Sequence, residues 1–161
     1  GLGLRRGDRI AVLLENHIFY MPIVWGAFRC GLRVVTVATH LTPEDVDFIL
    51  EDSNATVLLT SLFMKSTLEN LRLTTVAQQN RFILDGQYSD FRSFEQAINQ
   101  MPISPVEDQS EGIEMLYSSG TTGRPKGIMK KLPLLGKELA VYSQETVQMF
   151  YRDAIQSEIK F

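Results

Sequence analysis

The first hundred residues alternate between short apolar runs and longer segments whose apolar positions recur every three or four residues. Continuous apolar runs are typical of strands buried on both faces of a parallel sheet, and they lie at residues 9–14, 34–38, 56–60 and 81–84. The periodic segments predict amphipathic helices, at residues 16–30, from 42 onward, at 62–71 and at 91–101. Strands that alternate with helices predict βαβ units, and therefore an α/β fold whose mostly parallel sheet carries helices on both faces.

The first predicted helix has an apolar stripe that we expect to face the core. The stripe consists of Ile18, Met21, Trp25 and Phe28. Gly31 follows at the position where a glycine commonly ends a helix. Pro22 lies in the second turn and cannot donate a backbone hydrogen bond, so the helix begins after Asn16 or bends at Pro22.

The second predicted helix begins at Thr42 and Pro43, because a threonine hydroxyl caps a helix and proline is tolerated at the first helical position. Its core face is expected to consist of Val46, Ile49 and Leu50. We interpret its acidic side chains as a solvated face rather than a metal site: Glu44, Asp45, Asp47, Glu51 and Asp52.

Composition and charge restrict the class of protein. The 161 residues predict one domain, and 16 basic against 19 acidic residues give a net charge of −3. A net negative charge argues against nucleic-acid binding, which requires a basic surface. The longest mostly apolar stretch, residues 18–30, is too short to cross a bilayer, and the N-terminus lacks a signal-peptide pattern. We therefore expect a cytoplasmic protein with no transmembrane segment, and, because the chain begins without Met, a piece of a longer protein.

Residues that commonly bind metals are sparse in the sequence. The single cysteine, Cys30, excludes an internal disulfide and a cysteine-rich zinc site, and we expect it to pack as a small apolar side chain. His17 and His40 are far apart in the sequence and have no neighbouring cysteine pattern. We expect both to be structural.

A segment rich in hydroxyls and glycines follows a change in composition. Residues 102–114 contain two prolines and four acids without a base, which predicts an exposed acidic connector. After a short apolar run at 115–117, residues 118–127 contain four hydroxyls, three glycines and two cations. Glycines let backbone N–H groups approach an anion, and hydroxyls and a lysine ammonium add donors for phosphate oxygens. We interpret residues 115–131 as a phosphate-binding loop, with a triphosphate as its counterpart.

Two other interpretations of this loop are weaker. A mobile glycine–serine linker is disfavoured because the segment directly follows a strand and contains the stiff, charged sequence Arg-Pro-Lys-Gly. A Walker A loop requires a glycine where Pro125 stands and a serine or threonine where Gly127 stands. Pro133 would also interrupt the helix that follows a Walker A loop.

Residues 117–128 resemble the signature loop of the adenylate-forming enzymes, the acyl-CoA synthetases and their relatives. That pattern is an aromatic residue, two small hydroxylated residues, Gly, Ser or Thr, Thr, Gly, a variable residue and Pro-Lys-Gly, and this sequence meets every position. Upstream segments at residues 3–11, 29–31 and 41–53 occur in the order the family shows. Thr121 favours acyl-CoA synthetases over amino-acid-activating members, which more often have Ser there.

The resemblance implies a two-step reaction and places the chain in the large N-terminal domain of such an enzyme. ATP and a carboxylic acid, here a fatty or aryl acid, give an acyl-adenylate and pyrophosphate, and the acyl group then passes to coenzyme A. The implied phosphate-binding residues are Ser118, Ser119, Gly120, Thr121, Thr122, Gly123 and Lys126. Thr121 or Thr122 is the implied ligand of Mg²⁺, and Arg124 stands at the variable position without an assigned role.

The sequence departs from the family in its length and its last part. The later motifs and the C-terminal domain of the family are missing, so we expect no complete catalytic set and no ligase activity from 161 residues alone. Residues 132–161 match poorly and predict an amphipathic helix with Leu139, Tyr142, Thr146 and Met149 on one face. The alternatives are a non-catalytic nucleotide- or phosphate-binding module and an amino-acid-activating domain.

Overall fold

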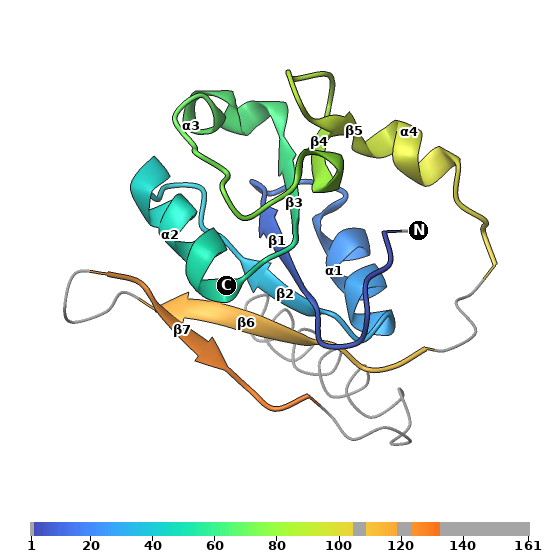
Figure 1. The fold of residues 1–161 in the computed structure, drawn as a ribbon. Helices are drawn as coiled ribbons and strands as arrows, with labels where there is room; N and C mark the ends of the chain where they lie inside the picture. The colour runs from blue at the N-terminus through green and yellow to red at the C-terminus, as the bar shows by residue number, and fades with distance from the viewer. Residues whose placement is uncertain (1, 105–108, 119–123, 133–161) are drawn as a thin grey trace, which may run out of the picture.

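The computed structural model describes residues 2–104, 109–118 and 124–132. These residues form one seven-stranded sheet in the order β5-β4-β3-β1-β2-β6-β7 (Figure 1). The strands are β1 Arg9–Leu13, β2 Arg33–Thr36, β3 Val57–Ser61, β4 Arg81–Leu84, β5 Arg92–Ser93, β6 Ile113–Ser118 and β7 Lys126–Met129. Neighbouring strands are parallel except for the antiparallel pair β6 and β7. The predicted α/β class with a mostly parallel sheet is confirmed.

Helices cover both faces of the sheet, as the alternation of elements predicts (Figure 1). The helices are α1 Tyr20–Arg29, α2 Pro43–Ser53, α3 Lys65–Leu68 and α4 Phe94–Asn99, with 3₁₀ turns η1 Leu62–Met64 and η2 Gln78–Asn80. Buried side chains of α2 and α3 form one core with one face of the sheet. Buried side chains of α1 pack against the other face, together with the partly buried Phe94 and Ala97 of α4. In β1, Ala11 and Leu13 face α2, whereas Ile10 and Val12 face α1, because successive side chains of a strand point to opposite faces.

The start of α2 agrees with the prediction, since the Thr42 hydroxyl accepts a hydrogen bond from the Asp45 N–H at 3.2 Å. Its core face is also confirmed, because Val46, Ile49 and Leu50 are at most 1% exposed. The helix ends at Asn54, whose φ of 50° places it in the left-handed conformation that commonly stops a helix.

The stripe predicted for α1 is wrong. Ile18, Met21 and Trp25 are exposed, and the buried residues are instead Ile23, Val24 and Ala27, while Phe28 is partly buried. The helix begins only at Tyr20, so Pro22 falls in its first turn, where a missing backbone donor costs little. Almost every residue from 18 to 28 is apolar, so two stripes were available to the helix and periodicity could not choose between them.

The prediction for Cys30 is also wrong, and the exposure predicted for the connector at 102–114 is wrong at its end. Cys30 is exposed rather than packed. The last part of the connector is not exposed: Gly112 and Ile113 are buried, and the Gly112 N–H donates to the Phe28 carbonyl at 2.7 Å. A Cβ on Gly112 would overlap the Leu32 carbonyl oxygen, so the close approach depends on glycine.

In the described ranges, no helix combines the length and apolar character needed to cross a membrane.

The solvated face predicted for α2 is wrong at Asp47, because the side chain of this residue is buried. Only 3% of the residue is exposed, and its carboxylate accepts hydrogen bonds from the backbone N–H groups of Arg72 and Leu73 at 3.0–3.2 Å. The Arg72 Nε donates to the same carboxylate at 3.2 Å. The segment after α3 is thereby fixed to α2.

We expect Asp47→Ala to lower the free energy of unfolding by about 2–3 kcal/mol, because it leaves buried N–H groups without an acceptor. Urea unfolding followed by circular dichroism measures the change. Glu44→Ala, on the exposed side of the same helix, is the matched control and should change the free energy by less than about 0.5 kcal/mol. Equal effects of the two substitutions would show that the buried carboxylate has no special importance.

Candidate functional site

The carboxyl ends of β1, β2, β3 and β6 lie at one edge of the sheet because these strands run parallel. From β1 the chain continues into α1 on one face, and from β2 it continues into α2 on the opposite face. The strand order therefore reverses around β1. Such a switch point opens a crevice outside the carboxyl ends of the strands, and ligands of doubly wound proteins bind there.

A cleft of about 1000 Å³ opens at this edge. It is lined by residues that directly follow the strands: Leu14, Glu15, Asn16, His17 and Ile18 after β1, Thr36, Val37, Ala38, Thr39 and His40 at the end of β2, and Phe63 after β3. Tyr20 and Met21 of α1 and Leu116 and Tyr117 of β6 complete the lining. The size and the mixture of apolar walls with a few polar groups are typical of a small-molecule site.

The predicted phosphate loop connects β6 to β7 beside this cleft. Of its candidate residues, Ser118 ends β6 and Lys126 begins β7, and the two are direct partners in the antiparallel register. Both are exposed, and by strand alternation they share a face with Leu116, which lines the cleft. The candidates Ser119, Gly120, Thr121, Thr122 and Gly123 lie outside the described residues, as does the predicted helix at 133–161.

The cations of the predicted loop do not all have the same surroundings. The Lys130 ammonium donates to Glu114 at 2.7 Å. Within the described residues no acidic side chain forms an ion pair with Lys126 or Lys131, and both are exposed. Lys126, at the start of β7, is therefore available to an anionic ligand, because no carboxylate of the described residues forms an ion pair with it.

Tyr117 occupies the last position but one of β6, on the face opposite to Ser118. Its hydroxyl donates a hydrogen bond to Asp52 Oδ2 at 2.6 Å. Burial raises the pKa of Tyr117 above its ordinary value, and the bond to Asp52 and the negative charge of that carboxylate raise it further. The phenol therefore remains a protonated donor throughout the physiological pH range.

Glu15, His17 and Asp85 meet at the edge of the cleft, with one potential ligand atom from each within 4.8 Å of the others. The His17 ring stacks on Phe19, and its Nδ1 accepts the Phe19 N–H at 3.1 Å. The ring proton is therefore assigned to Nε2, which donates to Asp85 Oδ2 at 2.9 Å. Glu15 in turn accepts the Ser61 hydroxyl at 2.6 Å. With both ring nitrogens engaged, this group fits a hydrogen-bond network, in agreement with the structural role predicted for His17.

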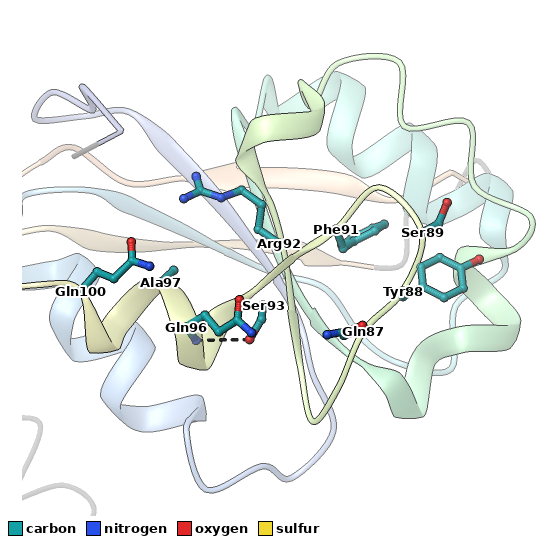
Figure 2. A pocket seen from close by; sticks show the side chains of 9 residues that line it. All are labelled: Gln87, Tyr88, Ser89, Phe91, Arg92, Ser93, Gln96, Ala97 and Gln100. Carbon is teal, nitrogen blue, oxygen red and sulfur yellow. Dashed lines mark hydrogen bonds between the residues drawn. The ribbon is translucent and has the colours of Figure 1, made fainter.

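A second hollow, of about 420 Å³, lies beside β5 and α4 (Figure 2). Its lining residues are Gln87, Tyr88, Ser89, Phe91, Arg92, Ser93, Gln96, Ala97 and Gln100, which include no carboxylate. Its only cationic side chain is already engaged, because Arg92 stacks on the Phe82 ring at 5.0 Å and donates to the Gln79 carbonyl. This hollow offers no combination of groups for catalysis.

Several residues of the cleft were not predicted from the sequence to be functional. Glu15, Thr36 and Thr39 were assigned no function, and His40, expected to be structural, is exposed at the cleft. The signal that could have found Glu15, Thr39 and His40 is positional, because each lies just after a predicted buried strand, whereas Thr36 lies within the predicted strand and ends β2 only in the structure. The carboxyl ends of such strands converge at one edge in a parallel sheet.

The sheet places the chain in the doubly wound class of α/β domains, which bind ligands at the carboxyl edge of the sheet. The chain belongs to the AMP-binding enzyme family, whose sequence model matches residues 1–134.

Two curated relatives illustrate the family. The chain is 24% identical over 160 residues to the long-chain-fatty-acid–CoA ligase FadD13 of Mycobacterium tuberculosis strain H37Rv, covering 96% of this chain and 30% of that protein. It is 29% identical over 136 residues to the crotonobetaine/carnitine–CoA ligase of Escherichia coli O6:K15:H31, covering 80% and 26%. The chain thus spans less than a third of the length of either relative.

Solved structures share the fold. A Mycobacterium tuberculosis fatty acyl CoA synthetase has a TM-score of 0.66 at 23% identity, with 81% of this chain and 25% of that one covered. The anthranilate CoA ligase AuaEII in complex with anthranoyl-AMP has a TM-score of 0.64 at 27% identity, with 80% and 26% covered.

We expect His17→Ala to lower the free energy of unfolding by about 1–3 kcal/mol, because Asp85 and the Phe19 N–H lose their partner. His40→Ala, at an exposed histidine of the same cleft, should have little effect. Calorimetric titration with Zn²⁺ tests the network directly and should give no saturable binding. Micromolar Zn²⁺ binding that disappears in His17→Ala would instead identify a metal site.

Proposed function

We propose that this chain is the phosphate-binding part of an acid–thiol ligase. In this reaction a carboxylic acid attacks the α-phosphate of ATP to give an acyl-adenylate and pyrophosphate, and the thiol of coenzyme A then takes the acyl group. Membership of the AMP-binding enzyme family supports the proposal, as do relatives named as CoA ligases of a long-chain fatty acid, of crotonobetaine and carnitine, and of anthranilate. We propose a fatty or aryl acid as the substrate class on the same grounds.

The observation that supports this function most directly is the pairing of Ser118 with Lys126 beside the switch-point cleft. A hydroxyl and an ammonium group are placed together at the two ends of a loop with three further hydroxyls and two glycines. We propose that residues 118–123 and Lys126 bind the β- and γ-phosphates.

The chain's contribution to the first step is positioning and charge neutralisation. Phosphoryl groups need little covalent help from a protein, but their negative charge grows on the leaving pyrophosphate. An ammonium and several hydroxyl and N–H donors, fixed around that charge, stabilise it more as the reaction proceeds. We propose Mg²⁺ as a further counter-charge, held by Thr121 or Thr122, whose hydroxyl oxygens are of the kind this ion accepts.

We also propose that the 161 residues alone bind ATP but do not complete the two-step reaction, since the relatives named for it are much longer. Cytoplasm is the proposed location, where ATP and coenzyme A are both at hand. We propose no partner beyond ATP, the acid and coenzyme A.

Substituting Lys126 tests the function in the protein expressed over its whole reading frame. Lys126→Ala should weaken ATP binding at least about tenfold, the loss typical of one charge-assisted hydrogen bond, and leave AMP binding unchanged. Lys65→Ala, an exposed lysine of α3 outside the cleft, is the matched control. Calorimetry measures both nucleotides. ATP binding that is no tighter than AMP binding and insensitive to Lys126→Ala would exclude the proposed role.

Pyrophosphate exchange with fatty, aryl and amino acids then identifies the substrate class. Exchange stimulated by amino acids alone would assign the chain to amino-acid activation. Binding of ATP with no exchange for any acid would indicate a non-catalytic module.

A further inference from the structure

Two side chains of α2, one helical turn apart, contact the two sides of the proposed phosphate loop. Phe48 and Asp52 are four positions apart in the sequence and therefore lie on the same face of the helix. Asp52 accepts the Tyr117 hydroxyl at 2.6 Å, immediately before the loop. Phe48 lies under the guanidinium of Arg124, 5.5 Å from its ring centroid, immediately after residues 119–123. One turn of α2 thus contacts the chain where it enters the loop and where it leaves it.

The hairpin of β6 and β7 leaves room for the contact between Tyr117 and Asp52. Tyr117 is paired in register with Gly127, so their side-chain positions share the face that points toward α2. A Cβ on Gly127 would lie 3.0–3.2 Å from Met115 Cε and from Cζ and the hydroxyl oxygen of Tyr117. Glycine at this position leaves the space in which the phenol ring lies against the β7 backbone.

Neither contact belongs to the phosphate-binding chemistry itself. Tyr117 lies on the face opposite to Ser118 and Lys126, and its hydroxyl is a donor already used by Asp52. Arg124 is engaged with an aromatic ring of α2, although a cation beside a phosphate loop would otherwise be assigned to the phosphates. A cation over an aromatic face is held in a defined place at modest cost in hydration.

We propose that α2 positions the phosphate loop, with Asp52–Tyr117 and Phe48–Arg124 as the two contacts of a clamp. The proposal rests on the function proposed above and assigns roles to Arg124, Phe48 and Asp52 that the loop motif does not include. Its physical basis is entropy. Ordering a segment around a ligand costs conformational entropy, and this cost is smaller when both ends of the segment are already fixed.

Conservative substitutions test the clamp in the protein expressed over its whole reading frame. Tyr117→Phe removes one oxygen and Arg124→Gln removes the charge, and each should raise KM for ATP about fivefold, the factor expected for one interaction of ordinary strength. The rate of thiol transfer from supplied acyl-adenylate should not change. The double variant should raise KM by less than the product of the single effects, because both contacts act on one loop.

Matched controls exist outside the site. Tyr88→Phe removes a hydroxyl next to the second hollow, and Arg92→Gln removes the cation that stacks on Phe82. Neither should change KM for ATP. Asp52→Asn keeps an acceptor for the Tyr117 hydroxyl and should retain more ATP affinity than Asp52→Ala. Arg124 is exposed, so Arg124→Gln tests the clamp even if a change at Tyr117 prevents folding.

The outcomes separate this proposal from the function on which it rests. Clamp variants that lower the melting temperature but leave KM for ATP unchanged, while Lys126→Ala still raises it, would overturn the clamp alone. ATP binding that Lys126→Ala does not affect would overturn the function. A rise in KM for ATP in the clamp variants and in Lys126→Ala, with the controls unchanged, supports both.

Discussion

The parallel pairing of β6 with β2 is the contact on which the candidate site depends. It adds residues 113–118 to a sheet whose central strands, β3, β1 and β2, come from the first 61 residues. Gly112 makes the approach possible, because its N–H bonds to the end of α1 and it has no side chain to collide with the Leu32 carbonyl. Ile113 then donates to that carbonyl at 3.0 Å. A slip of one residue would turn Tyr117 away from α2 and exchange the faces of the hairpin.

The pairing of β6 with β2 also determines where the proposed phosphate loop begins and ends. The carboxyl end of β6 comes to lie beside that of β2, and Leu116 and Tyr117 line the switch-point cleft, so the connection to β7 begins next to this cleft. The hairpin with β7 then returns Lys126 to a position opposite Ser118. We propose that this segment binds an anion although the net charge of the chain is −3, which favours a specific anionic ligand over general attraction of polyanions.

The sequence was sufficient for β1 to β4 and for the fold class, because continuous apolar runs between helical segments leave few arrangements other than a parallel sheet. It did not predict β5, which lies within the helix expected at 91–101, or β7, which lies within the expected phosphate loop. It was insufficient where two faces of a helix are equally apolar, and where a contact joins residues that lie far apart in the sequence. Trp25 belongs to one of two apolar stripes on α1, and only packing against the sheet selects the other. Asp47 looks like its acidic neighbours until the segment around Arg72 folds back onto α2. The loop itself was recognisable from composition, but its attachment to Phe48 and Asp52 was not, since those residues precede it by about seventy positions.

Binding of the terminal phosphates of ATP by the connection from β6 to β7 is the proposal from which the others derive. It can be tested by a crystal structure of the protein expressed over its whole reading frame, in complex with a non-hydrolysable ATP analogue. We expect the β- and γ-phosphates within hydrogen-bond distance of Lys126 Nζ and the Ser118 hydroxyl, with Tyr117 still bonded to Asp52. Phosphates bound away from this hairpin, with Lys126 in contact only with solvent, would refute the proposal.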